Sequence, residues 1–159
     1  MNFTNLNLTL PSEEKTITIN DQQIKILPYL PISDKNDLIS IALQKAEVET
    51  GVYNDILLDM YFHLNIIYLY TNIEFSDEDR ADEFALYDIL EANEVIDKVI
   101  AAIGEEEYQL LEDYLQEVKW SNIKFKTSAA GVLKIFTEDL PKNAAAAQAI
   151  VDNFDKDKY

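Results

Sequence analysis

Residues 56–70 read ILLDMYFHLNIIYLY, and this stretch decides the class of fold. Its apolar side chains recur at spacings of three and four, which is the period of one face of an α-helix. The residues on that face are Leu57, Met60, Tyr61, Leu64, Ile67 and Tyr68. Asp59, His63 and Asn65 interrupt the run, which is too short to cross a bilayer. We therefore predict a helix packed in a protein core.

The chain on either side of this stretch is also helical in pattern. Ser33 is a suitable N-cap for a preceding helix that ends near Gly51, and Ser76 is a suitable N-cap for the next one. The first turn of that next helix is acidic, which suits the positive end of the helix dipole. The apolar positions of the two helices are Leu38, Ile39, Ala42 and Leu43 in the first, and Phe84, Tyr87 and Leu90 in the second.

The last third of the chain continues in the same way. A short helix over residues 95–103 is stopped by Gly104, and a longer one starts near Glu105 and reaches at least Val118. Its continuation through residues 120–125 is left open by the pattern. Val132, Leu133 and Phe136 mark another segment, and Asn143 can cap a last helix from Ala144 to about Phe154. The pattern predicts a bundle of about five to six helices.

The first 27 residues are predicted to be β-structure. Leu6, Leu8 and Leu10 alternate with polar residues, which is the period of a half-buried strand. Two further alternating runs, 16–19 and 23–26, flank Asn20-Asp21, a pair suited to a tight hairpin turn. Two or three antiparallel strands are expected. The predicted fold is thus α+β and mostly α, with a β-hairpin or strand arm at 1–27, a helical domain at 28–154 and a polar tail at 155–159.

Composition narrows the function classes. The 159 residues include thirty acids and thirteen bases, for a formal net charge of −17. Such a surface repels phosphate backbones and anionic membranes, so direct nucleic-acid or membrane binding is not expected. The absence of cysteine excludes disulfides and thiolate metal sites. The first residues do not form a secretory signal, so the cytosol is the expected compartment.

The only histidine, His63, lies four residues after Asp59 and therefore on the same helical face. A metal ligand or a general base is one interpretation of this pair. The other is a histidine at the edge of the core, hydrogen-bonded to a neighbour. We favour the second, because a metal site needs more ligands than the spacing offers. No phosphate loop, dinucleotide fingerprint, metalloprotease helix or nucleophile elbow is present. We predict no enzyme activity, no cofactor and no metal.

The strongest feature is acidic. Residues 74–113 hold fifteen acids and two bases. An EF-hand calcium loop is not matched, and a glycosidase carboxylate pair cannot be singled out among so many acids. Three interpretations remain, namely a solvated helix face, a docking patch for a basic partner, and carboxylates that imitate phosphates. The candidate interaction residues are Glu78, Asp79, Asp82, Glu83, Glu105 and Glu106, together with Trp120, which lies in the one basic and aromatic segment, beside Lys119, Lys124 and Lys126.

Several short motifs carry a family resemblance. They are residues 27–31 (LPYLP), 34–39 (DKNDLI), 70–75 (YTNIEF), 87–90 (YDIL), 106–108 (EEY) and 128–133 (SAAGVL). Across roughly residues 26–135 the chain resembles a group of small acidic proteins encoded by tailed bacteriophages of low-GC hosts. The resemblance implies a virion component or an assembly factor, and it carries no catalytic residues to transfer.

The leading hypothesis is therefore a phage structural or assembly protein, such as a capsid, connector or tail component or an assembly chaperone. It would act by protein–protein interaction with other virion or assembly subunits, in the host cytoplasm or the virion. The N-terminal strands and the predicted helix at 144–154 are peripheral elements that an oligomer could exchange between neighbours. The alternative hypothesis is an acidic nucleic-acid mimic that inhibits a host DNA-binding or defence enzyme.

Overall fold

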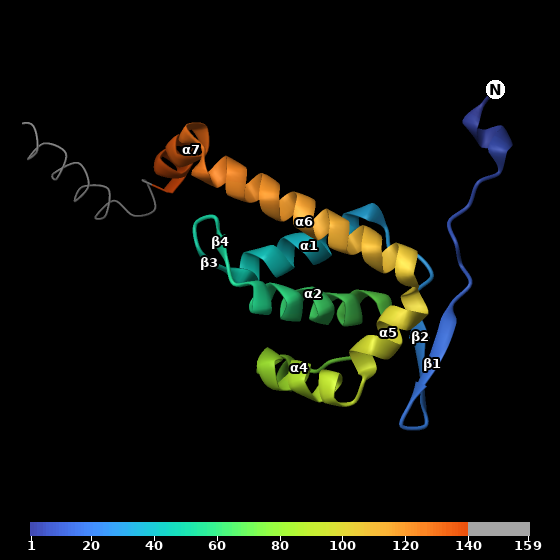
Figure 1. The fold of residues 1–159 in the computed structure, drawn as a ribbon. Helices are drawn as coiled ribbons and strands as arrows, with labels where there is room; N and C mark the ends of the chain where they lie inside the picture. The colour runs from blue at the N-terminus through green and yellow to red at the C-terminus, as the bar shows by residue number, and fades with distance from the viewer. Residues whose placement is uncertain (140–159) are drawn as a thin grey trace, which may run out of the picture.

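The structure is a computed structural model that describes residues 1–139 (Figure 1). Its elements in chain order are the 3₁₀ helix η1 (Phe3–Leu6), β1 (Lys15–Ile19), β2 (Gln22–Ile26), α1 (Ile32–Ala46), β3 (Glu47–Glu49), β4 (Val52–Tyr53), α2 (Asp55–Tyr70), α3 (Asp77–Arg80), α4 (Glu83–Ala92), α5 (Val95–Ile103), α6 (Glu105–Thr127) and α7 (Ala129–Asp139). The prediction of a mostly helical α+β fold with an N-terminal hairpin is confirmed. The predicted helix at 144–154 and the tail at 155–159 lie outside the described residues.

Helix α2, formed by the stretch that decides the fold, lies at the centre of the molecule. Asn54 caps α2, because the Asn54 side-chain oxygen accepts hydrogen bonds from the backbone N–H groups of Ile56 and Leu57. Helices α1 and α6 lie on one side of α2, and α4 and α5 lie on the other (Figure 1). The helix is therefore buried on nearly all of its faces. The prediction that only one face of the helix is buried was too narrow. The additional buried side chains include Leu58, Phe62, Asn65, Ile66 and Tyr70.

The predicted hairpin is confirmed. Strands β1 and β2 pair in antiparallel register with Ile17 opposite Ile24, and Asn20 and Asp21 both have positive φ, as a two-residue hairpin turn requires. The hairpin is joined to the end of α2, where the Leu27 N–H donates to the Tyr70 carbonyl (2.8 Å). The outer strand β1 carries Lys15, whose ammonium donates to the Ala102 carbonyl of α5.

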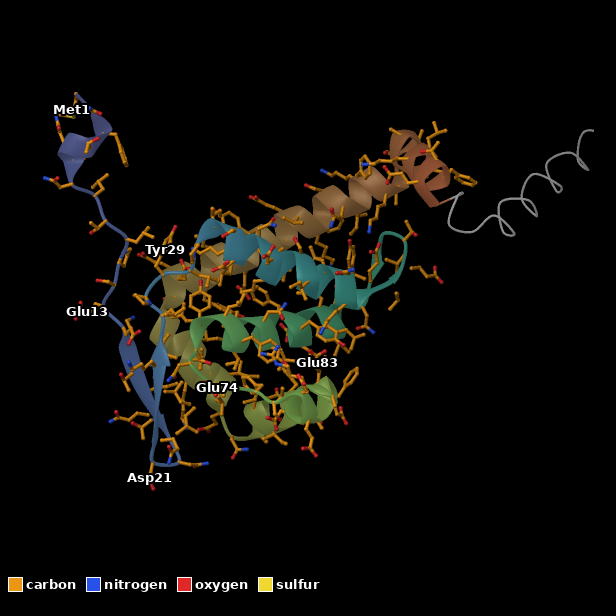
Figure 2. The ribbon with its side chains drawn as sticks, turned by 180° about the vertical axis from the view of Figure 1, so that it is seen from behind. Met1, Glu13, Asp21, Tyr29, Glu74 and Glu83 are labelled. Carbon is orange, nitrogen blue, oxygen red and sulfur yellow. The ribbon has the colours of Figure 1, made fainter. Side chains whose placement is uncertain are left out.

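The predicted strand at residues 6–10 is wrong. Residues 3–6 form η1, and the chain from Asn7 to Glu14 has no regular structure. Leu6, Leu8 and Leu10 are exposed. In residues 1–139 no strand pairs with this segment, so its alternating pattern has no surface to cover. We call residues 1–14 the arm, because they run away from the helical body (Figures 1 and 2).

Two helix boundaries also differ from the prediction. Helix α1 begins at Ile32 after Pro31, so Ser33 lies inside the helix and does not cap it. The helix ends before the short β3–β4 hairpin, which the sequence pattern did not indicate. Gly51 has φ +75 in that turn, and its N–H donates to the Glu47 carboxylate (2.8 Å), which stabilises a turn where a helix end was expected.

The helix predicted after Ser76 is divided in two. Ser76 caps α3 through a reciprocal capping box with Asp79, as its position predicts. Asp82 then caps α4 by accepting a hydrogen bond from the Ala85 N–H (3.1 Å), so the second helix has its own cap only six residues after the first cap. Phe84, Tyr87 and Leu90 all lie on α4.

The sequence pattern left open whether the helix that starts near Glu105 continues past Val118. In the structure this helix, α6, continues through residues 120–125 and ends at Thr127. The small residues after it bring α7 close to α6. Ser128 caps the new helix by accepting the Gly131 N–H (3.0 Å). A Cβ atom at Gly131 would lie 1.7 Å from the Phe125 carbonyl oxygen, so only glycine fits this corner. None of the helices in residues 1–139 combines the length and apolar character that spanning a membrane requires.

Candidate interaction surfaces

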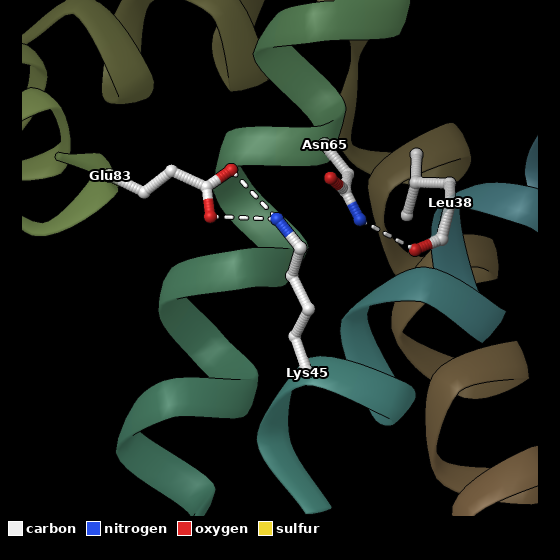
Figure 3. Close-up of polar contacts among 4 residues, drawn as sticks. All are labelled: Leu38, Lys45, Asn65 and Glu83. Carbon is white, nitrogen blue, oxygen red and sulfur yellow. Dashed lines mark hydrogen bonds and ion pairs between the residues drawn. The ribbon is translucent and has the colours of Figure 1, made fainter. Parts of the chain in front are cut away.

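Three of the predicted interaction residues hold the fold together. Asp79 accepts hydrogen bonds from the backbone and side chain of Ser76, and these bonds lower the pKa of its carboxyl group. Asp82 caps α4. Glu83 receives both hydrogen bonds of the Lys45 ammonium, at 2.8 and 2.7 Å, and so joins α4 to α1 alongside α2 (Figure 3). These three carboxylates have partners within the chain and are poor choices for a docking patch.

Asn65 supplies a second polar contact in the same region (Figure 3). It is buried in α2, and its side-chain nitrogen donates to the Leu38 carbonyl of α1 (2.9 Å). Lys45 also lies over the ring of Tyr61, 4.9 Å from its centroid. The α1–α2 contact therefore combines apolar packing with two polar contacts whose partners the sequence spacing could not identify.

Replacing Glu83 with glutamine removes the ion pair with Lys45 and should lower the free energy of unfolding by about 1 kcal/mol. The loss is no larger because the Lys45 ammonium is partly exposed and solvent screens the pair. Amides of α4 should also exchange faster in hydrogen–deuterium exchange. Glu78 is exposed on α3, and no hydrogen bond or ion pair in the described chain involves its side chain. Glu78→Gln is therefore the matched control. It should change the free energy of unfolding by less than about 0.5 kcal/mol. Equal effects from the two variants, measured by urea denaturation, would contradict this assignment.

The remaining acidic candidates lie on another part of the surface. Glu105 and Glu106 are exposed in the first turn of α6, where they border an open hollow of about 400 Å³ with Leu110 and Asp113. Helix α6 and helix α4 lie on opposite sides of α2 (Figure 1). The structure therefore does not bring Glu78 and its neighbours together with Glu105 and Glu106 in one patch.

A buried charged cluster was missed by the sequence analysis. Lys35 is only 4% exposed, and its ammonium lies 2.7 Å from the Glu107 carboxylate. The hydroxyl of Tyr70, also buried, donates to the same carboxylate. Burial and this hydrogen bond raise the pKa of Tyr70. The cluster joins α1, α2 and α6, and no spacing rule links residues so far apart in the chain.

His63 belongs to a smaller cluster between α2 and α6. Its Nε2 atom lies 2.9 Å from the Tyr108 hydroxyl, and the two rings are nearly parallel. Its Nδ1 atom lies 3.4 Å from the Asp59 carboxylate, and the nearby imidazole lowers the pKa of Asp59. The adjoining hollow measures about 180 Å³. In residues 1–139 no three His, Asp or Glu side chains are grouped so that they could hold a metal ion.

Trp120 is exposed on the C-terminal half of α6, the helix that leads to α7 at one end of the molecule. We define the α6–α7 surface by its exposed apolar side chains, which are Trp120, Phe125, Val132, Leu133 and Phe136. Residues 119–137 contain four lysines and no acid, in a chain that is otherwise strongly acidic. Lys119 pairs with Asp55 and Lys126 pairs with Glu47, while Lys124 is exposed.

The arm is the second apolar surface. Met1, Phe3, Leu6, Leu8 and Leu10 are all exposed, and their exposed fractions range from 45% for Leu6 to 109% for Met1. The arm starts at the hairpin end of the molecule, and the α6–α7 surface lies at the opposite end (Figure 1). Trp120, predicted as a candidate interaction residue, is exposed, whereas the leucines of the arm, predicted to lie in a half-buried strand, are exposed outside any strand.

No protein family, no curated protein and no solved structure was found to match this chain.

Proposed function

We propose that this protein is a structural or assembly subunit of a tailed bacteriophage that acts by binding other protein subunits. The observation that carries the proposal is the concentration of exposed apolar side chains on the arm and on the α6–α7 surface. Scattered apolar residues are normal on a soluble protein, but groups that contain aromatic residues are characteristic of protein interfaces. The resemblance to small acidic phage proteins supplies the biological setting.

The distribution of charge supports the same proposal. Among the lysines of residues 119–137, Lys134 lies over the ring of Phe125 and Lys124 is exposed, whereas residues 74–113 are strongly acidic. Opposite charges at different parts of one surface steer association between copies or between subunits, and they fix the orientation of docking.

The nucleic-acid mimic has less support. Such a protein needs rows of free carboxylates at phosphate-like spacing, but Asp79, Asp82 and Glu83 are occupied by contacts within the chain. Glu105 and Glu106 lie away from them on α6.

The test measures self-association and virion incorporation of the full chain. Size-exclusion chromatography with light scattering should show a mass that rises with concentration, or a stable complex with a subunit from purified particles of the phage that encodes the protein. Trp120→Asp should weaken that association at least tenfold. Phe84→Asp is the matched control, because Phe84 is equally exposed on α4 and belongs to neither surface.

The proposal fails if the protein stays monomeric at every concentration and is missing from particles and from assembly intermediates. It also fails if Trp120→Asp and Phe84→Asp behave alike, because the α6–α7 surface would then have no special role.

A further inference from the structure

We infer that residues 6–10 of the arm add as an antiparallel strand to the outer edge of β1 in a second copy of this chain. The inference rests on the proposed function, because it names the partner and the geometry of one subunit contact. Its physical basis is the match between an open sheet edge and a segment that has the pattern of a strand but no sheet to join.

The open edge is that of β1. In a hairpin with a two-residue turn, the residue pair next to the turn exchanges both backbone hydrogen bonds, and bonded pairs then alternate along the ladder. The register therefore directs the backbone groups of Ile19, Ile17 and Lys15 towards β2. The N–H and C=O groups of Thr16 and Thr18 point the other way. In the part of the chain that the structure describes, no backbone hydrogen bond reaches them.

The other edge of the hairpin is already occupied. The segment after α2 lies along β2, where Ile26 forms a bridge with Thr71 and the Asn72 N–H donates to the Lys25 carbonyl (3.2 Å). Only β1 can therefore accept another strand. Figures 1 and 2 both show β1 on the outside of the hairpin, with the arm leading away from it.

The two faces of the hairpin differ. Ile17 and Ile19 are half-buried and pack against the core, whereas Thr16 and Thr18 face solvent. An added strand must therefore place apolar residues beside the isoleucines and polar residues beside the threonines.

The arm supplies that pattern. With Leu8 opposite Ile17 in an antiparallel pairing, Leu6 lies opposite Ile19 and extends the apolar face of the hairpin. The same register puts Thr9 opposite Thr16, with both residues on the polar face. A shift by one residue would move every leucine to the solvent face. A shift by two residues in one direction would bring Pro11, which has no N–H, into a hydrogen-bonded position opposite Thr16.

The remaining polar pair is Asn7 opposite Thr18. Asn7 has φ +50 at the end of η1, a conformation that asparagine adopts and leaves at low cost. Pairing with β1 requires it to become extended.

The partner is a second copy and not the same chain, because of the connection between the arm and β1. To fold back on its own β1, the chain would have to reverse its direction within residues 11–14, and the structure has no turn in these four residues. Pro11 holds itself and Leu10 in extended conformations, which carries the arm away from the body. Glu14 is 3.3 Å from Lys25 across the hairpin, and this contact favours a straight entry into β1.

A designed disulfide tests the register. The chain has no cysteine, so the double variant Asn7→Cys/Thr18→Cys carries only the two introduced thiols, and digestion distinguishes a 7–18 link from 7–7 and 18–18 links. Residues directly opposite in an antiparallel sheet have Cα atoms about 5.5 Å apart, within disulfide range. A mixture of ¹⁴N- and ¹⁵N-labelled chains, oxidised and digested, should give a mixed-isotope peptide that joins residue 7 of one chain to residue 18 of another. Leu8→Cys/Thr18→Cys, with side chains on opposite faces, is the control and should not cross-link.

Point variants test the energetics. Leu8→Asp should weaken self-association at least tenfold, while Thr9→Asp adds the same charge on the solvent face and should leave it nearly unchanged. Thr18→Pro removes an outward N–H without touching the β1–β2 bonds, and it should weaken association as Leu8→Asp does. Circular dichroism checks that the helical body is intact in each variant.

The outcomes separate this inference from the proposed function. A disulfide found only within one chain would show that the arm folds back on its own hairpin, and would overturn the inference. So would an oligomer that persists in Leu8→Asp and Thr18→Pro without any cross-link, although the proposed function would then survive. A protein that is monomeric and binds no virion subunit would overturn both.

Discussion

Replacing Lys35 with methionine is expected to lower the free energy of unfolding by about 3 kcal/mol, the low end of the range for breaking a buried ion pair. Lys35 is almost completely buried, and its loss leaves the Glu107 carboxylate, which is itself mostly shielded, without its cation. The low end is appropriate because Glu107 keeps the hydrogen bond from Tyr70 and some contact with solvent. Urea denaturation followed by circular dichroism measures the change.

The double variant Lys35→Met/Glu107→Leu provides the first control. Because it removes both charges from a region of low dielectric, it should recover most of the lost stability. The surface pair of Lys98 and Glu94, with a separation of 3.7 Å and two exposed side chains, provides the second. Lys98→Met should cost less than about 0.5 kcal/mol. If Lys35→Met is no more destabilising than Lys98→Met, the buried cluster does not contribute to stability as the structure indicates.

The second large effect is a loss of stability above pH 10. Burial raises the pKa of Tyr70, and so does its hydrogen bond to the Glu107 carboxylate, whereas an unfolded tyrosine ionises near pH 10. Above that pH the unfolded state loses a proton that the folded state keeps, so the free energy of unfolding falls as pH rises. The expected slope is about 1.4 kcal/mol per pH unit from Tyr70 alone. The contribution of Tyr70 to the free energy of unfolding is fully present below pH 10.

The variant Tyr70→Phe isolates this effect. At pH 7 it should be less stable than the parent by about 1.5 to 3 kcal/mol, because it loses a hydrogen bond to a charged group. Between pH 10 and 11.5 the difference should shrink, because the variant has one fewer tyrosine to ionise. Urea midpoints at half-unit pH intervals provide the measurement. Burial also raises the pKa of Tyr68, Tyr87 and Tyr108, so the variant keeps part of the alkaline slope. Parallel pH curves for the two proteins would rule out this role for Tyr70.

The positions that sequence reasoning predicted well are those with a local cause. The Asn20-Asp21 turn and the Ser76 capping box depend on contacts within four residues, and both are present. The stop at Gly104 is equally local, because a residue with φ +101 ends α5 and precedes α6. The capping role of Asp82 was also predictable from local sequence, because an aspartate directly before a helical segment is a favoured N-cap residue.

The positions predicted poorly depend on partners far along the chain. Glu83 was taken for a surface residue because nothing in its neighbourhood indicated Lys45, which lies 38 positions earlier. The ion pair of Lys35 and Glu107 is likewise invisible to any periodicity. Leu6, Leu8 and Leu10 failed for a different reason. Their alternating pattern is typical of a strand, but no strand within residues 1–139 pairs with this segment.

The sequence by itself determined the helical character of the chain, the hairpin turn, the helix boundaries at Ser76 and Gly104, and the excess of negative charge, because these follow from side-chain period, capping and composition. Only the tertiary structure decided which acids are engaged within the fold, that α2 is buried nearly all round, and that the apolar arm and the α6–α7 surface lie at opposite ends. Those outcomes depend on which helices come together in space, and the free energy that selects one packing over another comes from contacts between residues that are distant in the chain.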